Sequence, residues 1–189
     1  FQKYFAAEQA ARDSLRVILG RNAPAKTDQA GLASALRAVL HENPLGRGDA
    51  PVILNGHQQL GVLLPALKNF VLISGGPGTG KTFIVLNLLR VLTRIGIAAD
   101  RIRIAAPTGR AARKMAESIQ KGIASIRNRP SHDDALLSLQ GTTLHRLLRY
   151  SPAKDDYLHN RLNPLEADLI IIDEASMIDI VLLGKLFEA

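Results

Sequence analysis

The spacing of apolar residues divides the chain into predicted helices and predicted strands. Apolar residues recur every three or four positions, which is typical of one buried helix face, in the segments 1–19, 28–41, 55–67, 82–95 and 110–122 and from about residue 177 onward. Strands are predicted at 70–74, 101–106 and 169–172. The last of these is a continuous apolar run, which suits a sheet covered on both faces.

Residues at the ends of these segments support the boundaries. Asp28 is a plausible N-cap, Gly96 is well placed to end the helix before it, and Thr142 or Thr143 caps a short helix. Pro65 must kink or end the third helix, because proline lacks the N–H donor.

The helix predicted at 82–95 has an apolar face and a polar face. The predicted buried residues are Ile84, Leu88, Val91, Leu92 and Ile95. Asn87, Arg90 and Arg94 are expected to point away from the core.

Strands that alternate with helices predict an α/β protein with a parallel sheet and helices on both faces. The turn-rich stretch 42–51 contains two glycines and two prolines, so we predict a boundary there. It would separate a small N-terminal helical segment, 1–50, from an α/β domain, 51–189. The stretches 122–141 and 151–167 are predicted to be largely irregular, apart from a short apolar patch at 135–139.

Composition narrows the classes of function. The 189 residues include no cysteine, which excludes disulfide frameworks, cysteine-ligated zinc and thiol catalysis and agrees with a reducing cytoplasm. No apolar run approaches the roughly 18 to 20 residues that span a bilayer, so no membrane association is expected. The net charge of +7 favours a polyanionic partner such as nucleic acid.

The predicted strand at 70–74 leads into the glycine-rich sequence GGPGTGKT, which fits the phosphate-binding P-loop. Glycines let backbone N–H groups surround a phosphate, and the following helix directs its positive end at the same anion. Lys81 supplies charge for the β- and γ-phosphates of ATP, and the Thr82 hydroxyl suits Mg²⁺. The alternative is a plain glycine-rich turn. The predicted nucleotide-binding residues here are Gly75, Gly76, Pro77, Gly78, Thr79, Gly80, Lys81 and Thr82.

Two acids follow the predicted strand at 169–172. Asp173 would lie at the carboxyl end of that strand, where parallel sheets place their ligands, and we assign it with Thr82 to Mg²⁺. Glu174 can orient or deprotonate a water that attacks the γ-phosphate, so Glu174 and Lys81 are the predicted catalytic residues. The alternative is that the two acids only cap the next helix.

A third candidate site follows the strand at 101–106. Thr108 and Gly109 end that strand and Arg110 opens a helix, so a hydroxyl, backbone N–H groups and positive charge converge on one point. This arrangement would bind a nucleic-acid phosphate. The alternative is an ordinary turn with a solvated basic face.

The order of these motifs resembles that of superfamily 1 DNA helicases. GGPGTGKT at 75–82, APTGRAA at 106–112, TLHRLL at 143–148 and DEASM at 173–177 look like their motifs I, Ia, Ib and II. More narrowly, the segment 159–179 resembles the RecD group, the alpha subunits of exodeoxyribonuclease V. The similarity is loose over 16–57 and 122–141.

The resemblance implies a RecA-like, ATP-dependent translocase that moves 5′→3′ on DNA and acts in double-strand-break repair with other subunits of a RecBCD-type complex. It implies that Gln58 reads adenine and that Thr108, the 109–110 backbone, Thr143 and His145 lie along single-stranded DNA. For His145 a purely structural role is the alternative.

The resemblance also implies parts that this sequence does not contain. Such helicases have two lobes with ATP between them, and a further sheet strand is expected after Ala189. We therefore expect a piece of a longer protein that hydrolyses ATP poorly alone. Other functions remain open: a stand-alone or plasmid-transfer helicase, a nucleotide-gated binding subunit without productive hydrolysis, and, least supported, a small-molecule kinase.

Overall fold

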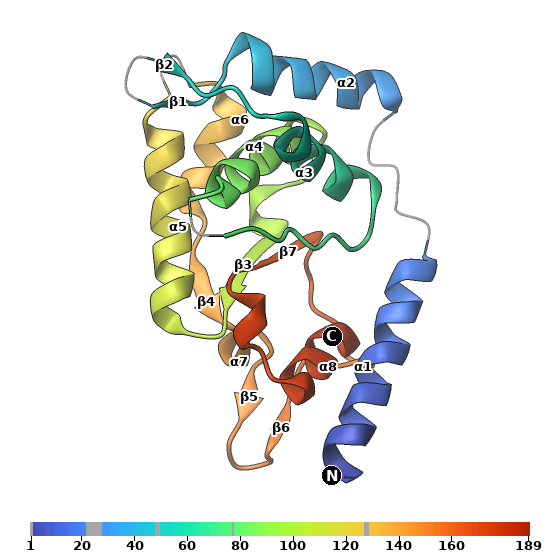
Figure 1. The fold of residues 1–189 in the computed structure, drawn as a ribbon. Helices are drawn as coiled ribbons and strands as arrows, with labels where there is room; N and C mark the ends of the chain where they lie inside the picture. Colours follow the sequence, from blue (N-terminus) through green and yellow to red (C-terminus); the bar gives the residue numbers. More distant parts are fainter. Residues whose placement is uncertain (1, 22–27, 48–49, 77, 127–128) are drawn as a thin grey trace. The chain divides into compact units, whose positions relative to one another are not determined.

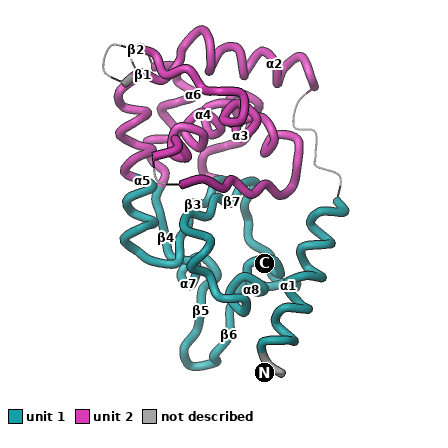
Figure 2. Tube along the Cα trace, in the orientation of Figure 1, with its two compact units in different colours: residues 1–21, 101–116, 140–189 teal, residues 22–100, 117–139 magenta. Residues whose placement is uncertain are grey.

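The computed structural model describes residues 2–21, 28–47, 50–76, 78–126 and 129–189. They form two compact units (Figure 2): unit 1 comprises 1–21, 101–116 and 140–189, and unit 2 comprises 22–100 and 117–139. Both units join segments that are distant in sequence. The boundary expected near residue 50 stays a prediction, and Pro77 lies outside the described residues.

Unit 1 is built on a three-stranded parallel sheet in the order β4-β3-β7 (Figure 1). Its strands are β3 (Ile102–Ala106), β4 (Gly141–Thr143) and β7 (Leu169–Ile172). The register pairs Ile104 with Gly141 on one side and with Ile171 on the other. Strands β3 and β7 were expected, whereas β4 was not.

Helices cover both faces of this sheet. Neighbouring residues of a strand point to opposite faces. Ala105 packs in a cluster with residues of α7 (Leu144–Leu147) and α8 (Ile180–Glu188), and Ala106 packs against α5 (Gly109–Ala124). The predicted α/β class, with a parallel sheet between helices, is confirmed.

The remaining elements of unit 1 surround this core. Helix α1 (Gln2–Gly20) packs along α8, where Gly184 lies against Ala7 and Ala11. Strands β5 (Tyr150–Ser151) and β6 (Asp156–Tyr157) form an antiparallel hairpin within the stretch predicted as loop. Short 3-10 helices occupy Ala175–Met177 and Ala99–Arg101, of which the second begins in the sequence of unit 2 and ends at the first residue of the 101–116 segment of unit 1.

Unit 2 is mainly helical. Its elements are α2 (Gln29–Arg37) with a π-helical turn (Ala38–Glu42), β1 (Gly46–Arg47), β2 (Ala50–Pro51), α3 (Gly56–Leu67), α4 (Lys81–Arg94), α6 (Ser131–Asp134) and a 3-10 turn (Ala135–Ser138). Its core contains Leu32, Ala35, Val39, Leu54, Val62, Ile84 and Val91. Helix α3 ends two residues after Pro65, in agreement with the expected break.

Local signals at the helix ends are confirmed. The Asp28 carboxylate accepts a hydrogen bond from the Gly31 N–H at 2.7 Å, and the Thr143 hydroxyl accepts one from the Arg146 N–H at 3.2 Å. Gly96 has the left-handed φ of +95° that ends a helix. Among the helices described, none combines the length and the apolar character needed to cross a membrane.

The strand predicted at 70–74 is wrong. Residues 70–76 form neither helix nor strand, and the Leu72 side chain is 72% exposed, although Ile73 packs against the core of unit 2. An apolar run becomes a strand only where a second strand supplies hydrogen-bonding partners for its backbone. No described residue pairs with this segment in a β-ladder.

The polar face predicted for α4 is also wrong. Asn87 is 3% exposed and Arg90 is fully buried. Of the predicted apolar residues, Ile84, Leu88, Val91 and Leu92 are buried as expected and Ile95 is half-buried. For the two arginines the cause is α6, which packs on α4 and brings Asp133 against Arg90 and Arg94. A stretch predicted to be irregular therefore covers the second face of this helix.

Candidate functional site

The P-loop turns into α4 through two glycines with left-handed backbones. Gly78 has φ +77° and Gly80 has φ +87°, a region that residues with a Cβ atom rarely adopt. A Cβ atom on Gly75 would lie 2.7 Å from the Thr79 hydroxyl oxygen. The geometry of this loop therefore favours glycine at positions 75, 78 and 80.

Lys81 is folded back over the loop that precedes it. Its Nζ donates hydrogen bonds to the carbonyls of Gly75 at 2.6 Å and Gly76 at 2.9 Å. Thr82, the next residue of α4, is exposed. The first N–H groups of a helix have no partner within the helix. An anion placed at this end of α4 would meet those N–H groups and the Lys81 charge together.

Gln58 contacts the P-loop directly. It lies in the first turn of α3, where Asn55 is the N-cap and the two side chains form a reciprocal capping box. The Gln58 Nε2 also donates a hydrogen bond to the Thr79 carbonyl at 3.0 Å. The structure thus brings Gln58 together with the other predicted nucleotide-binding residues of unit 2.

Asp173 and Glu174 follow β7 in unit 1, as predicted. The Asp173 N–H donates to the Ala105 carbonyl at 3.0 Å, which extends the pairing of β7 with β3 by one residue. One Asp173 carboxylate oxygen accepts from the Glu174 N–H at 2.9 Å. Glu174 is exposed and has φ +53°, a strained conformation for a residue with a side chain.

The chemistry of Asp173 fits the predicted metal. It is half-buried at the carboxyl end of its strand and offers carboxylate oxygen, the donor type that Mg²⁺ prefers. Thr82 offers hydroxyl oxygen from unit 2. Their joint use of one metal ion stays a prediction.

The sheet brings the predicted DNA-contacting threonines to one edge. Strands β3 and β4 are parallel neighbours, with Ala106 paired to Thr143. Thr143 ends β4 and Thr108 follows the end of β3, so both lie at the carboxyl-terminal edge of the sheet. A Cβ atom on Gly109 would lie 3.8 Å from the Thr143 methyl group. The Thr108 hydroxyl accepts from the Ala111 N–H at 3.2 Å, as Thr143 does in its own turn. Each hydroxyl therefore still has a proton that it can donate.

His145 and Arg110 are exposed on the same unit. The His145 ring lies 5.6 Å from the ring of Tyr150 and 6.0 Å from that of Tyr157, measured between centroids. Hydrogen bonding to Asp155 raises the pKa of Tyr150, and burial raises the pKa of Tyr157. Contact of Arg110 and His145 with DNA stays a prediction.

Sequence reasoning missed the two tyrosines. Tyr150 and Tyr157 are directly paired across the β5–β6 hairpin, with ring centroids 5.1 Å apart. The available signal was two aromatic residues on either side of a short stretch containing Pro152 and Asp155. Such a stretch is compatible with a hairpin turn.

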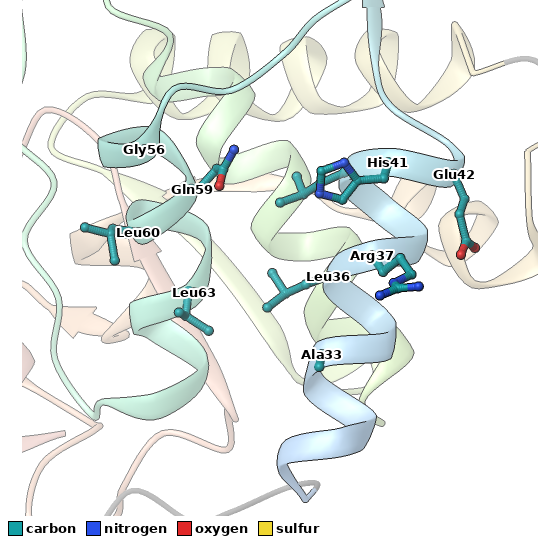
Figure 3. Close-up of a pocket in the computed structure, with 10 residues that line it drawn as sticks. Ala33, Leu36, Arg37, His41, Glu42, Gly56, Gln59, Leu60 and Leu63 are labelled. Atoms are coloured by element: carbon teal, nitrogen blue, oxygen red, sulfur yellow. The ribbon is translucent and has the colours of Figure 1, made fainter.

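Unit 2 contains an open groove of about 760 Å³, shown in Figure 3. It lies between α2 with its π-helical turn and α3. Its lining residues are Ala33, Leu36, Arg37, Leu40, His41, Glu42, Gly56, Gln59, Leu60 and Leu63. Gln59 faces this groove, whereas Gln58, one position earlier, contacts the P-loop.

A parallel sheet between helices and a glycine-rich loop that opens a helix with Lys81-Thr82 define a P-loop nucleotide-binding protein. Residues 58–189 match the family model described as an AAA domain, and the chain belongs to this family. The chain is similar to RecD proteins, in agreement with the resemblance of its motifs.

Three relatives show how far this similarity extends. The chain is 36% identical to the RecBCD enzyme subunit RecD of Haemophilus influenzae over 135 residues, which cover 70% of the chain. It is 38% identical to RecBCD enzyme subunit RecD of Mycolicibacterium smegmatis over 131 residues, 65% of the chain. It is 30% identical to the ATP-dependent RecD2 DNA helicase of Deinococcus radiodurans over 191 aligned positions, 98% of the chain. The aligned parts amount to 21%, 23% and 24% of these relatives, so the chain spans less than a quarter of their length.

Proposed function

We propose that this chain is part of the motor of an ATP-dependent DNA helicase, in which ATP hydrolysis drives movement along DNA. The observation that carries the proposal is the left-handed turn through Gly78 and Gly80 that delivers Lys81 and Thr82 to the first turn of a 14-residue helix. The names of the similar proteins support helicase activity, and a 5′→3′ direction rests on resemblance alone.

In the nucleotide site, each group has a separate task. A phosphate would replace the Gly75 and Gly76 carbonyls as the partner of Lys81, since an anion binds an ammonium group more strongly than a neutral carbonyl does. Thr82 and Asp173 would hold Mg²⁺, which neutralises phosphate charge when bound. Glu174 would accept a proton from the attacking water.

On the DNA side, the proposed contacts are to phosphates rather than to bases. The Thr108 and Thr143 hydroxyls can donate, and the N-terminus of α5 adds backbone N–H groups near Gly109. Arg110 adds a charge. These groups carry no sequence information, which suits a protein that must move along any sequence.

Two assemblies are compatible with this chemistry. RecD relatives are named as subunits of the RecBCD enzyme, which favours a partner complex and a role in repair of DNA breaks. The RecD2 helicase aligns with 98% of the chain, whereas the RecD subunits align with 65–70%. This wider match favours a helicase outside such a complex. Co-purification with large nuclease-helicase subunits would separate the two.

ATP turnover by the intact protein tests the motor function, measured with and without single-stranded DNA. We expect DNA to stimulate turnover, and both Lys81→Ala and Glu174→Gln to lower it by about 100-fold or more, because each removes a group that acts on the transferred phosphate or on the attacking water. Lys68→Ala and Glu166→Gln are matched controls, since both residues are exposed and neither belongs to the proposed site.

Equal turnover in all variants would contradict the proposal. Nucleotide binding without turnover, with or without DNA, would instead support a nucleotide-gated binding subunit.

A further inference from the structure

The Gln58 side chain links the first turn of α3 to the P-loop. Its Oε1 accepts a hydrogen bond from the Asn55 N–H at 2.9 Å, and its Nε2 donates one to the Thr79 carbonyl at 3.0 Å. A backbone N–H can only donate and a backbone carbonyl can only accept. Both the position and the orientation of the Gln58 amide are therefore set by backbone groups of the protein.

The amide lies against the P-loop where the loop turns left-handed. Gly80 follows Thr79 with φ +87°, and a Cβ atom there would lie 2.8 Å from the Gln58 Nε2. A side chain at position 80 would both strain the backbone and displace Gln58. The contact between Gln58 and the loop thus depends on the glycine of the P-loop motif.

Thr79 connects this contact to the groups around Lys81. Its carbonyl accepts from Gln58, and its hydroxyl donates to the Gly76 carbonyl at 2.9 Å. The same Gly76 carbonyl accepts from the Lys81 Nζ. A short series of hydrogen bonds therefore runs from Gln58 through Thr79 and Gly76 to the lysine that is placed to meet a phosphate.

We propose that Gln58 is a positioning residue for the phosphate-binding loop and that its contribution to nucleotide binding does not depend on the base. The inference rests on the proposed nucleotide-binding function. The resemblance instead implies that Gln58 reads adenine. The two roles differ in one measurable respect: loss of an adenine reader weakens only adenine nucleotides, whereas loss of a loop-positioning group weakens every ligand that uses the loop.

The test compares ATP, GTP and inorganic tripolyphosphate, each with Mg²⁺, by calorimetric titration of the intact protein. For Q58A we expect all three affinities to fall by the same factor, about 3- to 10-fold, since one hydrogen bond that orders the loop is lost. Tripolyphosphate has no base, so its weaker binding would arise from the loop alone.

Two further variants test whether the hydrogen bond from Gln58 to the Thr79 carbonyl is responsible for the loss of affinity. Q58E keeps an oxygen for the Asn55 N–H, as glutamate does in a capping box, but it cannot donate to the Thr79 carbonyl. We expect Q58E to keep the unfolding temperature of the wild type and to weaken all three ligands at least as much as Q58A. Q59A removes the neighbouring glutamine, which donates to the Leu54 carbonyl and faces the groove, and should bind all three ligands like the wild type.

The inference is overturned if Q58A weakens ATP but leaves tripolyphosphate unchanged, or if Q58E binds all three ligands like the wild type. Failure of the wild type to bind any of the three would overturn the proposed function and the inference with it. In either of the first two results the wild type still binds, so the two kinds of failure are distinguishable.

Discussion

At the scale of single residues, Gly141 shows how closely the elements of unit 1 approach one another. It begins β4 directly against the backbone of α5, and a Cβ atom there would clash with the Ala112 carbonyl oxygen. Real Cβ atoms do not come this close to backbone, so a larger residue would push α5 away from β4. Thr108 directly precedes α5 and Thr143 ends β4, so their proximity depends on this glycine.

We therefore expect Gly141→Ala to lower the free energy of unfolding by about 2 kcal/mol or more, as overpacking of a rigid contact does. Denaturant unfolding followed by circular dichroism measures it. Gly20→Ala is the control, because a Cβ atom there has nothing within 4 Å and should not lower stability. Equal stability of Gly141→Ala and the wild type would show that β4 does not pack on α5 as described.

At the scale of elements, helix α4 is held by a buried ion-pair network. Asp133 of α6 accepts from the Arg90 Nε at 3.0 Å and from the Arg94 Nη1 at 2.6 Å, and Arg90 also donates to the Asn43 carbonyl at 2.8 Å. Burial lowers the pKa of Arg90, and the negative charge of Asp133 opposes that shift. The network joins three segments of unit 2 that are distant in sequence.

Removing the negative charge of Asp133 should strongly lower the stability of the protein. We expect Asp133→Asn to lower the free energy of unfolding by about 3–5 kcal/mol, because two arginine side chains would lose their buried counter-charge. The neighbouring Asp134 pairs with Arg129 but is 54% exposed, so Asp134→Asn should cost only about 0–1 kcal/mol. Chemical denaturation of both variants measures the difference, and similar losses would contradict a buried network.

At the scale of the whole molecule, the charge of +7 bears on the proposed contact with DNA. Binding to phosphates releases counterions, so affinity for single-stranded DNA falls as salt rises, with a slope of about −0.7 per phosphate contact. Arg110 is exposed in the first turn of α5, beside the predicted phosphate-binding threonine Thr108.

Arg110→Gln should therefore reduce the magnitude of the logarithmic salt slope by about 0.7, in fluorescence anisotropy with an oligothymidylate between about 50 and 200 mM salt. The control is Arg16→Gln on α1, since Arg16 is 68% exposed and interacts with Asp13 at 3.9 Å. A salt slope that changes equally in both variants, or in neither, would contradict a contact between Arg110 and a DNA phosphate.

The sequence by itself determined those features that depend on neighbouring residues. Helix periods and caps such as Asp28 act within one or two turns, so the main helices were predicted close to their observed bounds. The P-loop was equally predictable, because the need for glycine at positions 78 and 80 arises from the local backbone. The positions of Asp173 and Glu174 after β7 followed from a single apolar run.

Only the tertiary structure decided the features that depend on distant partners. The segment 70–74 has strand-like residues, but a strand requires a neighbouring backbone. Arg90 is buried because Asp133, 43 positions later, supplies the opposite charge. Gln58 reaches Thr79 across 21 positions. Spacing along the chain identifies a residue with the right chemistry, but folding selects the group that this residue contacts, because the energy of a hydrogen bond or ion pair depends on distance in space.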